Sequence, residues 1–208
     1  MARYLMTQSL LSSWGYMFSC WEDGQEQAKE DFIGTLNREP TPVTEAMADG
    51  NAFETEVYAA AQGELRDPHP KWESGIQLVA GVIKGAPSQI RVQREIEVLG
   101  YKFLLYGVLD SLQAGVIFDV KYKSKSFGSL DLAGSYLESP QHPAYLYLVP
   151  EAHEFQYLVS DGVDLYREVY TRENTRFIGD IIAEFITSIE AMGLLGVYLD
   201  KWEAKNNA

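Results

Sequence analysis

Two acidic residues and a lysine near the middle of the chain have types and spacing that suit phosphate chemistry. Asp119 and Lys121 are separated by one residue within the apolar segment 116–122. If this segment is a strand, side-chain alternation places both residues on the same face. A tight turn at 113–115, centred on its last two residues, would pair Asp110 with Asp119 across a hairpin, about 5 Å away.

Such an arrangement predicts a site for a divalent cation. Like charges directly opposed on neighbouring strands are destabilising, and carboxylates among apolar residues need compensation. Hard oxygen ligands suit Mg²⁺ or Mn²⁺. A lysine on the same face can then stabilise an anionic transition state or help to activate water. The alternative is an ordinary hairpin whose surface Asp and Lys form a salt bridge.

The elements around this hairpin predict a central sheet flanked by helices. Proline at position 42 suits the first turn of a helix that ends near residue 62. Residues 3–20 resemble a short helical or irregular segment, and 174–203 resemble one long amphipathic helix. The expected strands are 89–98, 101–112, 115–123, 154–160 and 164–171, with 76–83 as either helix or strand and a helix from Ser139 to about 149.

This order favours a mixed α/β or α+β domain with a central mixed sheet. We expect one domain over residues 1–208, because this length suits a single sizeable core. Its parts are an N-terminal helical segment (1–40), a core with the chemical motifs (41–171) and a C-terminal helix (172–208).

Composition excludes several classes of protein. The single cysteine, Cys20, allows no internal disulfide and no Cys-rich zinc or iron–sulfur site. The net charge of −13 argues against a general nucleic-acid coat protein. Residues 84–125 nevertheless carry seven basic and four acidic side chains, so a local site for an anionic ligand is compatible with the sequence.

Nothing in the sequence suggests a membrane or secretory segment. No run of 18 apolar residues is present, and Thr7, Gln8 and Ser9 interrupt the N-terminal apolar stretch early. We therefore expect a cytoplasmic protein without a membrane partner.

Four short motifs in order resemble the PD-(D/E)xK nuclease superfamily, most closely its RecB-like and phage exonuclease branch. They span residues 50 to 150, and Gln8 to Trp14 also resembles the family's Ser-rich opening helix. The motifs are Gly50-Asn51-Ala52-Phe53-Glu54-Thr55-Glu56-Val57, like a helical Gly-x-x-Phe-Glu; Gly107-Val108-Leu109-Asp110, like G-x-x-D; Asp119-Val120-Lys121, like (D/E)-x-K; and Gln141-His142-Pro143-Ala144-Tyr145, like Q-x-x-x-Y. The resemblance implies a restriction-endonuclease-like core.

The resemblance also implies a role for each matching residue. Asp110 and Asp119 would bind Mg²⁺ or Mn²⁺, with Glu54 and the Val120 carbonyl as further ligands. Glu56 competes with Glu54 for the ligand position on the helix. Lys121 would be the catalytic lysine that positions or activates the attacking water. Four cysteines of some RecB-like relatives are absent, so no iron–sulfur cluster is expected.

Other residues are expected to contact DNA or support the site. Gln141 and Tyr145 are four apart and share one helix face, where the family's residues support the site and contact DNA. Lys123 and Lys125 follow Lys121, and either contact phosphates or form a solvated strand edge. His142 is expected to cap its helix or to pack near the helix start.

These features predict a metal-dependent DNA nuclease. By resemblance, an exonuclease acting on duplex DNA in phage-type recombination or repair is favoured, as a homo-oligomer or with a recombination-protein partner. The alternatives are a DNA endonuclease, a hydrolase of another phosphate ester, and a non-catalytic acidic binding protein on the same fold.

Overall fold

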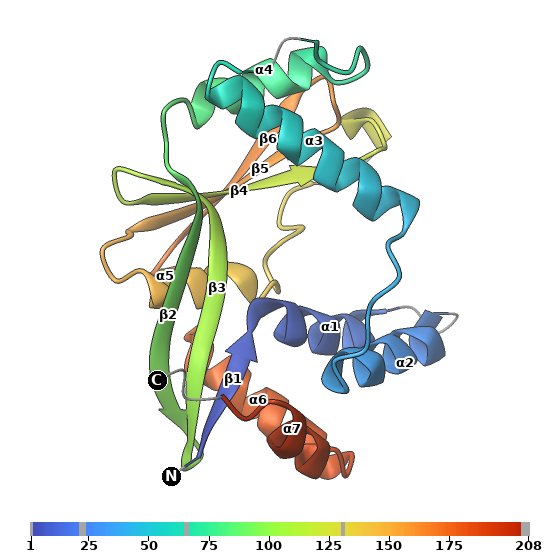
Figure 1. Cartoon of the computed structure of the whole chain (residues 1–208), viewed down its shortest axis with the longest axis vertical. Helices are drawn as coiled ribbons and strands as arrows, with labels where there is room; N and C mark the ends of the chain where they lie inside the picture. Colours follow the sequence, from blue (N-terminus) through green and yellow to red (C-terminus); the bar gives the residue numbers. More distant parts are fainter. Residues whose placement is uncertain (1, 21–23, 65–66, 130–131, 205–208) are drawn as a thin grey trace.

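The protein is a mixed α/β structure built on one twisted sheet of six strands (Figure 1). The computed structural model describes residues 2–20, 24–64, 67–129 and 132–204. The strands are β1 (Arg3–Thr7), β2 (Ser88–Val98), β3 (Tyr101–Gln113), β4 (Val116–Tyr122), β5 (Glu154–Ser160) and β6 (Leu165–Thr171). The prediction of a central mixed sheet flanked by helices is confirmed.

Strand β3 is the centre of the sheet. Along one edge it pairs antiparallel with β2 over most of its length. Its other edge is shared: β1 pairs parallel with residues 102–106, and β4 pairs antiparallel with residues 111–113. Strand β4 also pairs parallel with β5, and β5 pairs antiparallel with β6.

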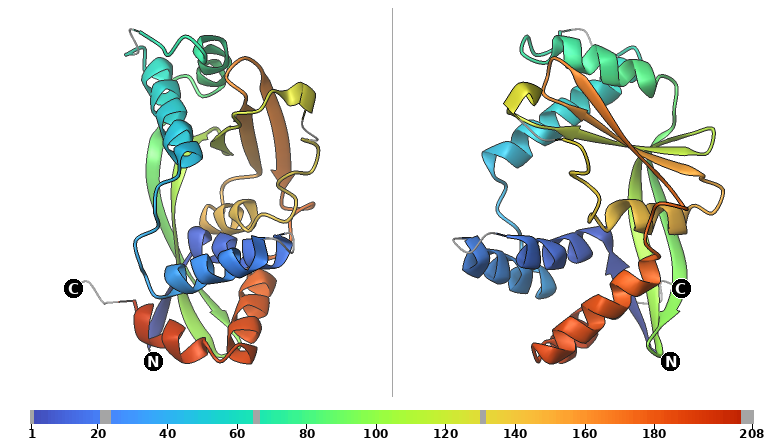
Figure 2. Two further views of the ribbon diagram at one scale, coloured as in Figure 1. Left: turned by 90° about the vertical axis from the view of Figure 1, so that its right-hand side faces the viewer. Right: turned by 180° about the vertical axis from the view of Figure 1, so that it is seen from behind.

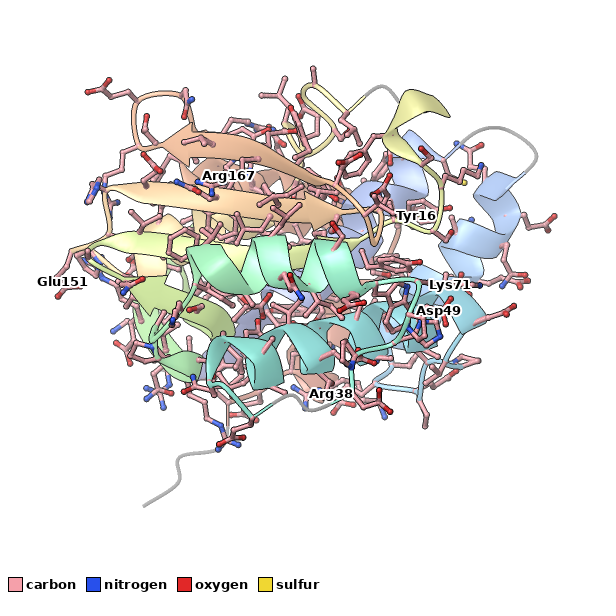
Figure 3. All side chains as sticks on the ribbon, turned by 90° about the horizontal axis from the view of Figure 1, so that it is seen from above. Tyr16, Arg38, Asp49, Lys71, Glu151 and Arg167 are labelled. Carbon is pink, nitrogen blue, oxygen red and sulfur yellow. The ribbon has the colours of Figure 1, made fainter. Side chains whose placement is uncertain are left out.

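Helices cover both faces of the sheet (Figures 1 and 2). The helices are α1 (Gln8–Ser19), α2 (Gln25–Leu36), α3 (Glu45–Ala61), α4 (Glu73–Val82), α5 (Gln141–Leu148), α6 (Ile178–Ala191) and α7 (Leu195–Lys201), with a 3₁₀ turn η2 at Phe127–Ser129. One apolar cluster joins α3 and α4 to Phe118 and Val120 of β4. A larger one joins the remaining helices to Ile117 and to β3, β5 and β6. From above, α3 and α4 lie side by side over the sheet, with Asp49 and Lys71 labelled (Figure 3).

The alternation expected along β4 is therefore observed. Phe118 and Val120 pack under α3 and α4, whereas Ile117 belongs to the cluster on the α5 side. This alternation also places Asp119 and Lys121 on the α5 side. The strand ends at Tyr122.

The expectation of a helical or irregular segment at 3–20 is wrong for its first residues. Arg3–Thr7 form β1, and Thr7 then caps α1 by accepting a hydrogen bond from the Leu10 amide. The strand depends on distant partners: β3 on one side and the C-terminal segment on the other, where the Leu5 amide donates to the Trp202 carbonyl. Positions 21–23 of the expected N-terminal segment lie outside the described residues.

The single helix expected over 174–203 is two helices. The α6 and α7 axes differ by 116°, and Gly193 between them has a positive φ of 71°, which ends α6. Phe177, the N-cap residue of α6, is exposed. Helix α3 begins at Glu45 with Thr44 as its N-cap, three residues after Pro42, where the sequence predicted the start. Residues 76–83, predicted as helix or strand, lie mostly in helix α4.

Among the described residues, no single helix has the length and apolar composition that crossing a membrane requires; the bent pair α6–α7 meets both conditions only when its two helices are taken together.

Candidate active site

The site begins where the β3–β4 hairpin opens. Three residue pairs, from Gln113–Val116 to Ser111–Phe118, follow the predicted register across a turn in which Ala114 and Gly115 both have positive φ. The ladder stops one step before Asp110 and Asp119. Residues 107–110 therefore have no strand partner on this edge of β3 within the described part of the chain.

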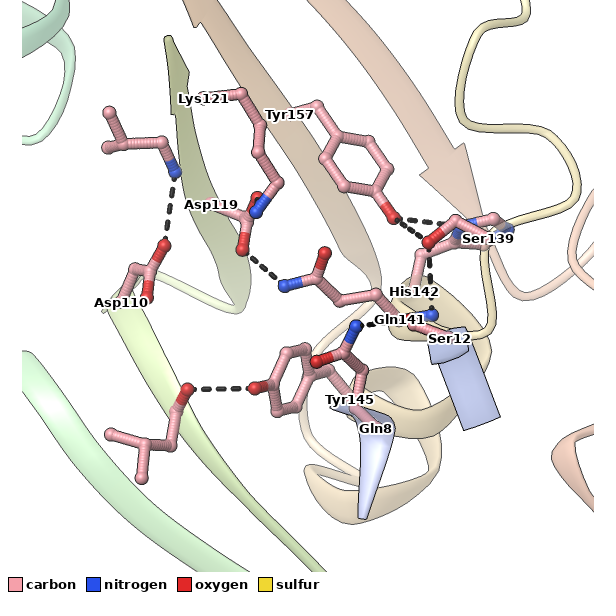
Figure 4. A network of polar contacts seen from close by, with 12 residues as sticks. Gln8, Ser12, Asp110, Asp119, Lys121, Ser139, Gln141, His142, Tyr145 and Tyr157 are labelled. Atoms are coloured by element: carbon pink, nitrogen blue, oxygen red, sulfur yellow. Dashed lines mark hydrogen bonds and ion pairs between the residues drawn. The ribbon is translucent and has the colours of Figure 1, made fainter. Parts of the chain in front are cut away.

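Side chains replace the missing ladder hydrogen bonds. The Val120 amide donates to Asp110 Oδ2 at 3.2 Å, and the Tyr145 hydroxyl donates to the Val108 carbonyl at 2.8 Å. Backbone groups buried without a partner are strongly disfavoured. The two motif residues Asp110 and Tyr145 thus stabilise the opening between the strands as well as facing it (Figure 4).

Asp119 is the most buried of the site carboxylates, at 3% exposure. Its Oδ2 lies 2.5 Å from Lys121 Nζ, and its Oδ1 accepts a hydrogen bond from Gln141 Nε2 (Figure 4). The structure therefore joins Asp119, Lys121 and Gln141 into one cluster. The hydrogen bond from Gln141 orients the carboxylate, and Oδ2 faces the Lys121 ammonium as an ion pair.

Lys121 is held as a cation. Burial alone lowers the pKa of its amine, but the negative charges of Asp119 and Asp110 raise it by more, so the net pKa is raised. One third of its side chain is exposed, so the ammonium can reach a ligand from solvent. In this arrangement Lys121 can donate hydrogen bonds to an anion or to water.

Asp110 and Glu54 complete an acidic group. Burial, followed by the charges of Asp119 and Glu54, raises the pKa of Asp110 to about 9. Burial, followed by the charge of Asp119, also raises the pKa of Glu54. Three carboxylates thus influence one another, and Lys121 is the cation that acts on both Asp110 and Glu54.

The structure distinguishes Glu54 from Glu56. Both lie on α3, but the Glu56 carboxylate accepts a hydrogen bond from the His69 amide at 2.8 Å, in the loop that precedes α4. Glu54 is instead the residue whose pKa responds to Asp119 and Lys121. Of the two candidates, Glu54 belongs to the acidic group.

The donor set is compatible with a divalent cation, although a ligand cluster is not preformed. No group of three or more His, Cys, Asp or Glu side chains in the described ranges is placed to hold a metal ion. Burial and the neighbouring carboxylates raise the pKa values of Asp110 and Glu54, and a divalent cation among these hard oxygen donors would lower them again. The Val120 carbonyl stays a predicted ligand.

Helix α5 reaches the site because β3 carries a glycine opposite it. A Cβ atom on Gly107 would lie 2.3 Å from Tyr145 Cε1, which no side chain tolerates. Gly107, the first residue of the G-x-x-D motif, thus leaves space for the ring of Tyr145, the last residue of the Q-x-x-x-Y motif. Burial, then the charges of Asp119 and Asp110, raises the pKa of Tyr145 to about 12.

Sequence reasoning missed three further tyrosines near the carboxylates. Tyr157 is the register partner of Asp119 on β5, and Tyr136 stacks on Tyr157 with ring centroids 4.1 Å apart. Tyr58 lies one turn after Glu54 on α3, and burial followed by the charge of Asp110 raises its pKa. Aromatic residues in strands and helices, such as Tyr157 and Tyr58, are typical of a core, and Tyr136 lies in an irregular segment, so their types alone gave no signal.

His142 packs in the core, as expected. It is 1% exposed, stacks on Tyr170 and lies 3.3 Å from the Tyr157 hydroxyl through Nδ1. Burial lowers its pKa to about 4, so the ring is neutral near pH 7.

The two lysines after β4 are exposed. Lys123 places its ammonium 5.6 Å from the centre of the Tyr136 ring, and its amide still bonds to the Ser160 carbonyl of β5. Lys125 lies in a bend beyond the strand and is also exposed. Phosphate contact by either lysine stays a prediction.

Comparison with known proteins identifies similar folds. No protein-family profile and no curated protein matches the sequence. The crystal structure of SSO0001 aligns with a TM-score of 0.50 and 14% identity, over 91% of this chain and 76% of that chain. The crystal structure of LHK-Exo in complex with dAMP aligns with a TM-score of 0.42 and 12% identity, over 94% of this chain and 89% of that chain. At 14% identity the similarity to SSO0001 concerns the fold alone.

Proposed function

We propose that the protein is a metal-dependent nuclease that hydrolyses phosphodiester bonds in DNA and belongs to the PD-(D/E)xK superfamily. The observation that carries the proposal is the grouping of Asp110, Asp119 and Lys121 at the opening of the β3–β4 hairpin. This opening lies beside Gln141 of α5 and within the influence of Glu54 of α3. An ordinary surface salt bridge would require neither the buried carboxylate nor the supporting glutamine.

The metal site would use Asp110, Asp119 and Glu54, with the Val120 carbonyl as a further ligand and Mg²⁺ or Mn²⁺ as the cation. A bound divalent cation would polarise the phosphate and stabilise the attacking and leaving oxygens. Three carboxyl groups share the site with one ammonium group, that of Lys121, and a divalent cation would stabilise all three in the ionised form.

Each protein group has a separate task in hydrolysis. Lys121, held as an ammonium by Asp119, would orient the attacking water or stabilise negative charge on the phosphate. Gln141 would hold Asp119 in its orientation. Tyr145 would hold the unpaired backbone of β3 beside Asp110 through its hydrogen bond to the Val108 carbonyl. Gln141 and Tyr145 would thus position the site residues.

The finer proposal is exonuclease action on duplex DNA, in recombination or repair of the phage type. It rests on the resemblance of the four motifs to that branch. The net charge of −13 requires a locally favourable path for the DNA, which Lys121, Lys123 and Lys125 would supply together with bound metal ions. A homo-oligomer or a recombination-protein partner would enlarge that path.

Cleavage of end-labelled linear duplex DNA and of covalently closed circular DNA, each with Mg²⁺ or Mn²⁺, tests the proposal. We expect loss of the linear substrate alone, and no loss with EDTA. Lys121→Ala controls for contaminating nucleases, and Lys84→Ala is the matched control at an exposed lysine outside the site. Wild-type rates in Lys121→Ala would refute the proposal, whereas cutting of both substrates would indicate an endonuclease.

A second candidate function is a non-catalytic acidic binding protein on the same fold. The net charge of −13 favours it, as does the absence of a preformed three-ligand acidic cluster in the described ranges. Titration calorimetry with Mn²⁺ distinguishes the two functions. Saturable binding that Asp119→Asn abolishes supports the nuclease, and no binding together with no cleavage supports the binding protein.

A further inference from the structure

Tyr136 is anchored by contacts with Tyr157 and Glu168, although it lies in the irregular segment between η2 and α5. Its ring stacks on Tyr157 at an interplanar angle of 17°. Its backbone amide donates to Glu168 Oε1 at 3.1 Å. Lys123 lies 5.6 Å from the ring centre. These contacts fix the direction in which the phenol points.

The Tyr136 hydroxyl is buried and has no hydrogen-bond partner among the described residues. Buried polar groups are almost always paired, because an unpaired group loses its hydration without compensation. The ring is held without any help from this oxygen. Nothing in the fold therefore explains why a tyrosine rather than a phenylalanine stands at this position.

Tyr136 lies on the sheet face that carries the proposed active site. Tyr157 pairs with Asp119 in the β4–β5 ladder, so their side chains share one face of the sheet, and Tyr136 covers Tyr157 on that face. Burial raises the pKa of Tyr136 to about 12, Lys121 lowers it, and Asp119 and Glu168 raise it. The phenol is thus a neutral hydrogen-bond donor beside the Lys121–Asp119 pair.

We propose that the Tyr136 hydroxyl donates a hydrogen bond to a non-bridging oxygen of the scissile phosphate, next to Lys121. The inference rests on the proposed nuclease function and adds a substrate-contacting residue outside the four motifs. The phosphate supplies the acceptor that the protein itself lacks. Tyr136 and Lys121 then approach the same phosphate from the loop and from the strand.

The substitution Tyr136→Phe removes the oxygen and keeps the stacked ring. We expect kcat/KM for linear duplex DNA to fall about tenfold to a hundredfold, as for loss of a hydrogen bond to a charged acceptor. Because an unpaired buried hydroxyl is removed, the melting temperature should stay the same or rise. Tyr101→Phe, at the far end of β3, is the matched control and should retain wild-type rates.

A substrate with one phosphorothioate of defined configuration at the cleaved linkage separates contact from mere structure. If Tyr136 binds one non-bridging oxygen, sulfur at that position slows the wild type more than it slows Tyr136→Phe. The other diastereomer should slow both proteins equally. Equal slowing of both proteins by both diastereomers would overturn the inference.

The failures of the two proposals are distinguishable. Wild-type protein that cleaves DNA, with Tyr136→Phe at the same kcat/KM, overturns the role of Tyr136 and leaves the nuclease intact. Wild-type protein that does not cleave DNA overturns the nuclease and the role of Tyr136 together. A fall in the melting temperature of Tyr136→Phe would overturn the statement that the hydroxyl has no structural partner.

Discussion

The Asp110 carboxylate accepts a hydrogen bond from the Val120 amide at 3.2 Å, at the point where strands β3 and β4 part. One residue thus substitutes for a ladder hydrogen bond and presents an acidic group beside Asp119. Side-chain hydrogen bonds to the backbone are a common way to end strand pairing without leaving buried amides unsatisfied. The opening of the hairpin and the acidic site are consequently the same structural feature.

Replacing Gly107 by alanine tests the contact between β3 and α5. The added Cβ would lie 2.3 Å from Tyr145 Cε1, so the ring must move and its hydrogen bond to the Val108 carbonyl is strained. We expect a loss of about 1–3 kcal/mol in the free energy of unfolding, measured by urea denaturation, together with reduced cleavage.

Gly81→Ala is the matched control for this substitution. Gly81 lies in helix α4 with open space around the added atom, so alanine should be neutral or stabilising by up to about 1 kcal/mol. Equal stability of Gly107→Ala and the wild type would show that α5 does not depend on this close approach.

The stability of the metal-free protein should fall as pH rises, because of Asp110. Its pKa is raised from the ordinary carboxyl value to about 9, so between pH 4 and 9 the folded state binds more protons than the unfolded chain. The contribution of the protonated Asp110 carboxyl to the free energy of unfolding is fully present below pH 4 and is lost as pH approaches 9. Asp110→Asn keeps a hydrogen-bond acceptor for Val120 and removes the charge.

Thermal denaturation at pH 8 in EDTA measures this effect. We expect Asp110→Asn to melt higher than the wild type by roughly 5 °C. Added Mn²⁺ should raise the melting temperature of the wild type and leave that of Asp110→Asn nearly unchanged. A variant less stable than the wild type in EDTA would contradict the raised pKa.

His142 should give a second, opposite dependence on pH. Burial lowers its pKa from the ordinary 6.5 to about 4, so the unfolded chain binds more protons between these values. The neutral ring contributes about 3 kcal/mol to the free energy of unfolding. This contribution is complete above pH 6.5 and is lost as pH falls to 4. His142→Asn, whose amide can replace Nδ1 beside Tyr157, should lack this part of the acid destabilisation.

Urea denaturation at several pH values in this window gives, for both proteins, the slope of the free energy of unfolding against pH. This slope reports the number of protons taken up on unfolding, which should be smaller by about one for His142→Asn. Identical slopes would mean that His142 titrates normally in the folded protein and is not buried as a neutral ring.

The hairpin was predictable from sequence, because local rules determine it. Alternation in 116–122 assigned the faces of Phe118 and Asp119, and the positive φ values of Ala114 and Gly115 complete a two-residue turn that fixes the register. The opening after the third pair was not predictable. It depends on β1 taking over the edge of β3 at residues 102–106, far away in the sequence.

The elements that were wrong have different causes. Strand β1 is short, and its hydrogen-bond partners are β3 and the segment around Trp202. The turn at Gly193 interrupts an apolar pattern that continues through it, so periodicity alone favoured one helix. Tyr136 lies outside every regular element, and only its stacking on Tyr157 brings it to the site.

Glu54 and Glu56, two of the acidic residues of α3, differ in the groups that they contact. Glu54 shares the electrostatic environment of Asp119 and Lys121, whereas Glu56 accepts a hydrogen bond from the His69 amide in the loop before α4. We expect Glu54→Gln to weaken Mn²⁺ binding at least about tenfold and to reduce cleavage by two orders of magnitude or more, as for loss of a metal ligand. Glu56→Gln, which keeps an acceptor for His69, should retain both properties within about twofold. Calorimetric Mn²⁺ titration and single-turnover cleavage of linear duplex DNA measure the two effects. A reversed order of the two variants would assign the helix ligand to Glu56 and would require α3 to rotate relative to β4.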